Sequence, residues 1–213
     1  MVLLRLFRNE PEPEVLGFRN MLYYFMIFKE IGMKKLFSCL FLMFFAFAAY
    51  AQQTSRLGQT GPGGGIIFFD KGVSSDGWQY LEAAATGTEF RNVYWGAFDQ
   101  NIAGTSTAVG SGKRNTELIV TRLMQLGETG RAAQLCESLN FNGLADWFLP
   151  SKDELDMMYR NLKQRGLGGF GDGYYWSSSQ GSNYYAWFQS FGNGSQYNYS
   201  KNDPYTVRAV RAF

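Results

Sequence analysis

The C-terminal part of the chain, from Tyr174 onward, restricts the possible fold most strongly. Four segments there alternate aromatic with small polar residues, and Gly, Asn, Asp and Pro separate them. Period-two patterning of this kind predicts short β-strands joined by turns. We expect strands over residues 174–179, 184–191, 195–201 and 205–213. Strands that are joined by tight turns pair antiparallel.

A second group of strands is predicted at the start of the same region. Residues 66–69 follow the glycine-rich stretch 61–65, and residues 78–83 follow a turn at 74–77, which predicts a hairpin. Residues 145–150 form another short apolar segment that ends at a proline.

Helices are predicted between these two groups of strands. Apolar residues recur at helical spacing over residues 115–126 and 130–139. A third helix begins after Ser151, because Glu154 completes a capping box three residues later. Residues 86–114 are expected to form a long irregular loop that Trp95 and Phe98 pin to the core. The sequence thus predicts an α+β fold with an antiparallel sheet, two to three helices and long loops.

Residues 33–51 have the form of a signal peptide. Two lysines follow Met33, residues 36–49 are uncharged, and residues 49–51 match the small–x–small cleavage pattern. The uncharged run is 14 residues long, whereas a transmembrane helix needs roughly 20. We therefore expect cleavage after Ala51 and export to the periplasm, the outer surface or the medium. An uncleaved anchor is the alternative.

The rest of the chain divides around this signal. Residues 1–32 are interpreted as an upstream extension that is not used, although a genuine extension is the alternative. Residues 52–60 are polar and predict a linker, and residues 61–213 form the expected domain. After cleavage the protein is not expected to be an integral membrane protein.

Charge and composition exclude several classes of function. The first 51 residues hold six of the 20 Lys and Arg and four of the 18 Asp and Glu, which leaves 14 of each and no net charge. A nucleic-acid partner is therefore not expected. The chain has no histidine, and Cys136 is the one cysteine after residue 51. We expect no internal disulfide, no His-based catalytic triad, no zinc site and no cofactor.

Three short patterns invite a chemical interpretation. Residues 110–114 superficially resemble a phosphate-binding loop, but the first glycine and the final Ser or Thr of that motif are missing. Asp153, Glu154 and Asp156 are interpreted as first-turn helix residues, with a glycosidase-like pair or a calcium site as the alternative. Cys136 is interpreted as a buried, inert thiol rather than a reactive one.

The aromatic strands carry the candidate binding site. Flat rings can stack on the apolar faces of sugars while amides bond to sugar hydroxyls. The alternative is that Tyr and Trp are simply suited to β-sheets. We expect these ligand-binding residues: Tyr185, Trp187, Tyr197, Asn198, Tyr199 and Lys201.

An ordered set of motifs carries a family resemblance over residues 58–213. The motifs are Gly61–Phe69, Asp76–Ala84, Asn115-Thr116, Asp146–Leu155, Tyr175–Ser179, Ala186-Trp187 and Val207–Arg211. Together they resemble the C-terminal domain family of the bacterial collagen-like adhesin Lcl, a domain family of unknown function, and are similar to the Fibrobacter major paralogous domains.

The resemblance implies a C-type-lectin-like fold, related to the formylglycine-generating enzyme domain, in an exported or surface protein. It implies architectural roles for Asp146, Trp147, Leu149, Pro150, Trp176, Ser177, Ser178 and Trp187. Arg208 and Arg211 match the closing arginines of the family, and their odd spacing points them to opposite sides of a strand. We expect both to form structural ion pairs.

Three functions follow as hypotheses. The first is an exported, non-enzymatic binding module for a glycan or another cell-envelope ligand, similar to an adhesin. The second is a structural envelope protein with protein partners, marked by a large flat apolar patch. The third is a relative of the formylglycine-generating enzyme, which needs a pair of site cysteines that hold copper.

Overall fold

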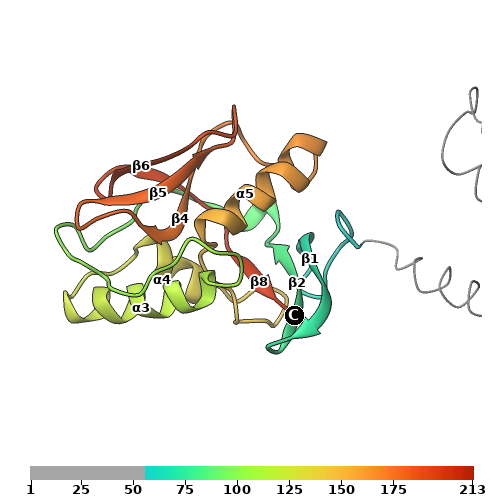
Figure 1. Ribbon diagram of the computed structural model, residues 1–213, viewed down its shortest axis with the longest axis horizontal. Helices are drawn as coiled ribbons and strands as arrows, with labels where there is room; N and C mark the ends of the chain where they lie inside the picture. Colours follow the sequence, from blue (N-terminus) through green and yellow to red (C-terminus); the bar gives the residue numbers. More distant parts are fainter. Residues whose placement is uncertain (1–55) are drawn as a thin grey trace, which may run out of the picture. The chain divides into compact units, whose positions relative to one another are not determined.

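The computed structural model describes residues 56–213, which fold into two β-sheets and three α-helices (Figure 1). The strands are β1 Ile66–Ser75, β2 Trp78–Ala83, β3 Phe90–Tyr94, β4 Tyr174–Gln180, β5 Tyr185–Ser190, β6 Gln196–Ser200, β7 Pro204–Val207 and β8 Val210–Ala212. The helices are α3 Gly112–Gln125, α4 Ala132–Glu137 and α5 Lys152–Asn161, with 3-10 turns η1 Thr86–Thr88 and η2 Lys163–Arg165. The α+β class is confirmed, and the C-type-lectin-like assignment stays a prediction.

The smaller sheet has the order β1-β2-β8. The predicted hairpin is confirmed, and its turn uses positive φ at both Asp76 and Gly77, as two-residue hairpin turns require. Strand β1 continues to Ser75 rather than ending near Phe69, with register shifts along the pair. Residues 56–60 of the expected linker lie against β1, because Gly58 N donates to Ile67 O and Ile67 N donates to Gln59 O.

The glycine-rich stretch before β1 surrounds a buried carboxylate. Glu82 of β2 is fully buried, and Gly63 N and Gly65 N donate to its two oxygens at 3.0 and 3.2 Å. Arg211 of β8 adds a charged donor at 3.2 Å. A Cβ on Gly65 would lie 2.2 Å from Ala83 O, so the close approach of the two backbones requires glycine there.

The larger sheet has the order β3-β7-β4-β5-β6. Strands β4, β5 and β6 form the predicted antiparallel meander, but β7 pairs parallel with β4 through Tyr175 and Thr206. The sequence predicted a purely antiparallel sheet, and this parallel pair makes the sheet mixed. Strand β7 lies between β3 and β4 and pairs with both, although both are distant from it in sequence.

The predicted C-terminal strand over 205–213 is wrong as a single element. Residues 204–207 belong to the larger sheet and residues 210–212 to the smaller one, so the chain changes sheets at Arg208 and Ala209. Arg208 is buried there, and its guanidinium bonds to Glu89 Oε1 at 2.5 Å and to Ala84 O at 2.8 Å. Arg211 bonds to Asp146 and Glu82, so both predicted ion pairs are confirmed.

The expected loop over 86–114 holds more regular structure than the sequence indicated. It contains η1, strand β3 and the start of α3, which begins at Gly112. Lys113 and Arg114 thus lie in the first helical turn rather than in a loop. Trp95 is fully buried as expected, but Phe98 is exposed and packs its ring edge-on against Tyr184 at 5.3 Å.

The two other helices follow the prediction more closely. Helix α4 occupies the centre of the expected segment 130–139. Helix α5 has the predicted capping box, since Glu154 N donates to Ser151 Oγ at 3.2 Å and Ser151 N donates to Glu154 Oε2 at 2.7 Å. The segment 145–150 forms only an isolated bridge, between Phe148 and Val210.

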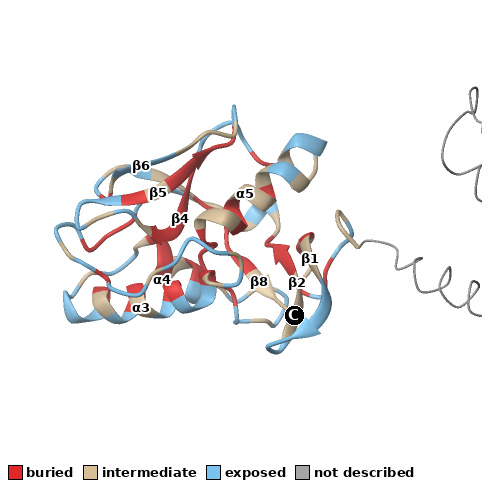
Figure 2. Cartoon of the chain, viewed as in Figure 1, coloured by how far each residue is buried: buried red, intermediate tan, exposed pale blue. Residues whose placement is uncertain are grey.

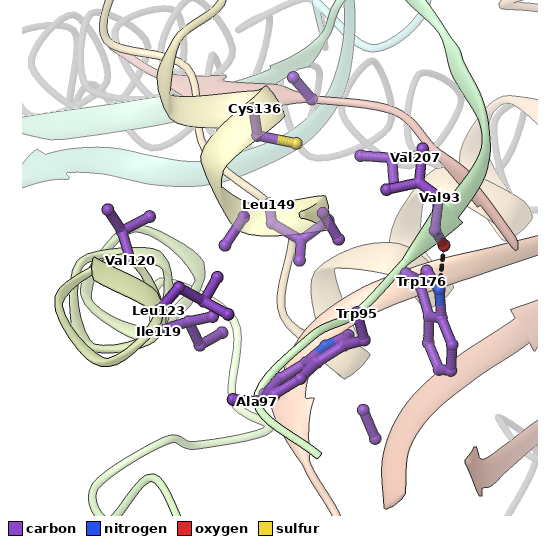
Figure 3. Packing of buried hydrophobic residues seen from close by; sticks show 14 of the residues in the cluster. Val93, Trp95, Ala97, Ile119, Val120, Leu123, Cys136, Leu149, Trp176 and Val207 are labelled. Atoms are coloured by element: carbon purple, nitrogen blue, oxygen red, sulfur yellow. Dashed lines mark hydrogen bonds between the residues drawn. The ribbon is translucent and has the colours of Figure 1, made fainter. Parts of the chain in front are cut away.

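Two buried clusters form the core, and Figure 2 shows buried residues on both the strands and the helices. In the first cluster Ile119 and Leu123 of α3 point toward Trp95, and Trp176 Nε1 donates to Val93 O at 2.9 Å (Figure 3). The second cluster fills the space around α5 and includes these residues: Phe68, Leu81, Leu155, Met158, Tyr175 and Phe191.

Two short segments contribute to both clusters. Trp147 and Leu149 belong to the first cluster and Phe148 to the second, while Trp176 and Tyr175 divide in the same way. Alternate residues of an extended segment point to opposite sides, so these segments join the two clusters into one interior.

The expected signal peptide and upstream extension, residues 1–51, lie outside the described residues. Within residues 56–213 no helix is long and apolar enough to cross a membrane.

Candidate functional site

The six residues expected to bind a ligand do not lie on one surface. Strands β5 and β6 pair antiparallel, with Trp187 opposite Asn198, Phe188 opposite Tyr197 and Ala186 opposite Tyr199. Residues directly opposite in such a pair share a face. Tyr185, Trp187 and Asn198 therefore lie on one face of the sheet, and Tyr197 and Tyr199 lie on the other.

Lys201 lies on neither face. Its side chain is fully buried, and its ammonium donates to Gln100 O and Gln180 Oε1 at 2.9 Å and to Ala97 O at 3.2 Å. The same ammonium lies 4.7 Å from the centre of the Trp95 ring. Burial lowers the pKa of Lys201 to about 8, while Glu128 opposes this shift. This placement corrects the expectation that Lys201 presents its charge to a ligand.

The face with Trp187 packs partly on helix α5. Lys152 places its ammonium 4.8 Å from the Trp187 ring. Gln189 Nε2 donates to Asp156 Oδ1 at 2.9 Å, and Gln196 Nε2 donates to Lys152 O at 2.8 Å. These contacts leave Trp187 half-buried, whereas Tyr185 and Asn198 remain exposed.

The opposite face carries a group of aromatic rings, which we call the tyrosine face. Its five members lie on four adjacent strands: Tyr205 on β7, Tyr174 on β4, Phe188 on β5, and Tyr197 and Tyr199 on β6. Tyr174, Tyr197 and Tyr199 are 49, 53 and 55 % exposed.

Four of the five rings of the tyrosine face pack against one another. The centre of the Phe188 ring lies 5.3 Å from that of Tyr174, 4.8 Å from that of Tyr205 and 5.8 Å from that of Tyr197. Trp176 lies on the same face, opposite Phe188, with its ring centre 4.5 Å from that of Tyr205. Since Trp176 is itself buried and bonded to Val93 O, it holds the Phe188 and Tyr205 rings in place.

The hydroxyl of Tyr205 stays protonated over the physiological range. Burial, together with Asp203, Tyr199 and Tyr174, raises the pKa of Tyr205 to about 12. The Tyr205 hydroxyl is therefore neutral and can both donate and accept hydrogen bonds.

Sequence reasoning found Tyr197 and Tyr199 but missed the other members of this face. Tyr174 and Phe188 had a usable signal, because alternate residues along β4 and β5 share a face with their cross-strand partners. Tyr205 had none, since its position depends on the parallel pairing of β7 with β4.

Two neighbouring hollows lie elsewhere, beside the first turns of α3. Their volumes are about 300 and 230 Å³, and Lys113, Glu117 and Phe148 line both. Trp78 and Arg114 add to the larger one. A third hollow of about 320 Å³ adjoins Arg208, Thr86 and Gly169.

The groups that suggested catalysis or metal binding have structural contacts. Cys136 is fully buried, which confirms the predicted burial, and burial raises the pKa of its thiol, which disfavours the reactive thiolate. Glu154 points inward to backbone N–H groups, and Asp156 pairs with Arg160 at 2.7 Å. Among residues 56–213 no group of His, Cys, Asp and Glu side chains is arranged to hold a metal ion.

Comparison with known proteins gives a family and a structural likeness. A fimbrial protein from Bacteroides ovatus is similar in structure, with a TM-score of 0.46 and 17 % sequence identity over 63 % of this chain. This chain spans 36 % of that protein's length. No curated protein matches the sequence. The model of the Lcl C-terminal domain matches residues 80–211, and the chain therefore belongs to the Lcl C-terminal domain family.

Proposed function

We propose that this domain is an exported, surface-associated and non-enzymatic module that binds carbohydrate polymers through its tyrosine face. The observation that carries the proposal is a set of tyrosine rings from β4, β6 and β7, of which Tyr174, Tyr197 and Tyr199 are exposed, on the sheet face that also holds the buried Phe188 and Trp176. Membership of the Lcl C-terminal domain family supports the coarser statement of an exported surface module.

The chemistry of the tyrosine face suits a polyhydroxylated ligand. Aromatic rings offer flat apolar surfaces on which the apolar faces of sugar rings can stack, and phenol hydroxyls can bond to sugar hydroxyls. The rings of Tyr174, Tyr205 and Phe188 have mutual centre distances between 4.8 and 5.3 Å. Because packing already fixes these rings, little conformational entropy is lost when a ligand binds.

The test is a comparison of the two faces of the β5–β6 hairpin. Residues 52–213 would be screened on a glycan array, with and without calcium, and hits would be titrated by calorimetry. The variant Tyr197→Ala/Tyr199→Ala should lower affinity at least about tenfold, because two stacking surfaces are lost. The matched variant Tyr185→Ala/Asn198→Ala, on the opposite face of the same strands, should leave affinity within about twofold.

Two results would contradict the proposal. One is a well-folded domain that binds nothing on the array. The other is a reversed ranking of the two double variants, which would move the binding site to the Trp187 face. Thermal unfolding of each variant checks that the fold is intact, since all four replaced residues are exposed.

A structural role with protein partners is the second candidate function. It is favoured by the exposure of Tyr174, Tyr197 and Tyr199, because aromatic side chains are enriched at protein interfaces. A silent array combined with concentration-dependent self-association that Tyr197→Ala/Tyr199→Ala abolishes would favour this role.

A further inference from the structure

We infer that the tyrosine face selects uncharged polysaccharides over acidic ones, and that Asp203 is the residue that sets this selectivity. The inference rests on the proposed function and specifies the class of ligand for the same site.

Few charged residues lie in the strands that form the tyrosine face. Strands β4, β5, β6 and β7 and the turns between them come from residues 173–207, and only Lys201 and Asp203 are charged in this stretch. Lys201 is fully buried, and protein oxygens already accept from its ammonium. The segment therefore presents no cation with which a sulfate or carboxylate could pair.

Two cations of the neighbouring segments lie beside carboxylates. Arg131 before α4 lies 2.8 Å from Glu128 Oε2. Arg91 of β3 is 73 % exposed and lies 3.5 Å from Glu89 Oε2, and Glu89 also pairs with Arg208. A nearby carboxylate therefore offsets part of the charge of each cation. Recognition of an acidic polymer requires unpaired cations along the contact surface.

Asp203 lies in the turn between β6 and β7. Its backbone N–H donates to Ser200 O at 3.0 Å, which fixes the turn. Its carboxylate oxygen Oδ2 is buried and has no hydrogen-bond partner. A buried carboxylate oxygen without a donor is costly, and a sugar hydroxyl that binds at the turn would supply the missing donor.

The charge of Asp203 also acts on the tyrosine face directly. Together with burial and the neighbouring Tyr199 and Tyr174, it raises the pKa of Tyr205. The same negative potential that disfavours a phenolate disfavours a sulfate or a uronate beside Tyr205. A neutral hydroxyl experiences no such repulsion.

The experiment uses pairs of polymers that differ in charge but share a backbone. Hydroxyethyl cellulose is compared with carboxymethyl cellulose, and dextran with dextran sulfate, by affinity electrophoresis of residues 52–213 at low and high salt. In any polymer pair that the domain binds, the neutral polymer should bind at least about fivefold more tightly than the acidic one at low salt. Added salt should reduce this difference in affinity.

The variant Asp203→Asn tests the assigned residue. It keeps the size of the side chain and removes the charge, so the preference for the neutral polymer should fall to within about twofold. The control is Asp172→Asn, since Asp172 precedes β4 but is exposed and pairs with Lys163 at 2.6 Å. The control should keep the wild-type preference.

Each outcome bears on a different statement. An acidic polymer that binds as tightly as its neutral partner, or more tightly, overturns the inference and leaves the proposed function standing. An unchanged preference in Asp203→Asn overturns the role of Asp203. Failure of the folded wild-type domain to bind any of the four polymers overturns the proposed function together with the inference.

Discussion

At the scale of single residues, Glu154 is the group whose protonation most affects the fold near neutral pH. Its side chain is fully buried and accepts from Ser151 N and Gly110 N at 2.7 Å and from Gly112 N at 3.4 Å. Burial raises the pKa of Glu154 to about 7, and these N–H donors oppose the rise. The chain has no histidine, so few other side chains titrate between pH 5 and 8.

The stability of the domain should therefore depend on pH through Glu154. A raised pKa in the folded state gives a contribution that is fully present below the unfolded-state pKa of about 4.3 and is lost as the pH rises through about 7. The loss is at most about 4 kcal/mol. Melting temperatures at pH 5, 6, 7 and 8 should fall in the wild type and stay flatter in Glu154→Gln.

The matched control for this measurement is Asp153→Asn, in the same helical turn. The Asp153 side chain is 42 % exposed and lies 3.7 Å from the Lys152 ammonium, so its removal should leave the pH profile unchanged. Parallel profiles for the wild type and Glu154→Gln would contradict the assignment.

Lys201 should affect stability rather than binding. Lys201→Met removes the donor for Ala97 O, Gln100 O and Gln180 Oε1, and buried acceptors without a donor are costly. We expect a loss of about 2–3 kcal/mol in the free energy of unfolding by urea. Polymer affinity of the folded protein should not change. Lys113→Met, at an exposed lysine of α3, should change stability by less than about 0.5 kcal/mol.

At the scale of elements, the passage from β7 to β8 depends on the buried pair of Arg208 and Glu89. Their side chains are 1 and 3 % exposed, and Tyr175 also donates to Glu89 Oε1 at 2.8 Å. Arg208→Met leaves the buried Glu89 carboxylate with only the exposed Arg91 at 3.5 Å, which should cost about 3 kcal/mol in urea unfolding. The double variant Arg208→Met/Glu89→Gln should lose less, and equal losses would argue against charge as the cause.

The approach of β1 to β2 gives a second test at this scale. Gly65→Ala would push a methyl group toward Ala83 O and disturb the N–H that reaches Glu82. A backbone shift of this kind should lower the free energy of unfolding by about 1–3 kcal/mol. Gly72→Ala is the control, because nothing lies within 4 Å of the added Cβ, although its φ of +83° imposes the smaller cost of left-handed backbone.

At the scale of the whole molecule, the two core clusters should unfold together. Trp147, Phe148 and Leu149 alternate between them, as do Tyr175 and Trp176. Unfolding of one cluster therefore also removes the packing that holds these shared segments in the other cluster. Calorimetry of residues 52–213 should show one transition, with the calorimetric enthalpy equal to the van't Hoff enthalpy. Two resolved transitions would show that the clusters are independent.

Local signals in the sequence predicted most of the elements. The hairpin before residue 84, the α5 capping box and the meander of β4, β5 and β6 depend on hydrogen bonds between residues close in the chain. Periodicity and turn residues report such contacts directly. The same signals could not predict that residues 205–213 divide between two sheets, because the division depends on which distant strands pair.

The candidate site likewise has features that the sequence predicts and features that depend on tertiary packing. The sequence by itself determined the supply of aromatic residues, the absence of histidine and the alternation that places Tyr197 and Tyr199 on one side of β6. Only the tertiary structure decided that Lys201 is buried and that β7 brings Tyr205 beside Tyr174. The physical reason is that alternation fixes which residues share a face, whereas packing between distant segments decides which face is covered.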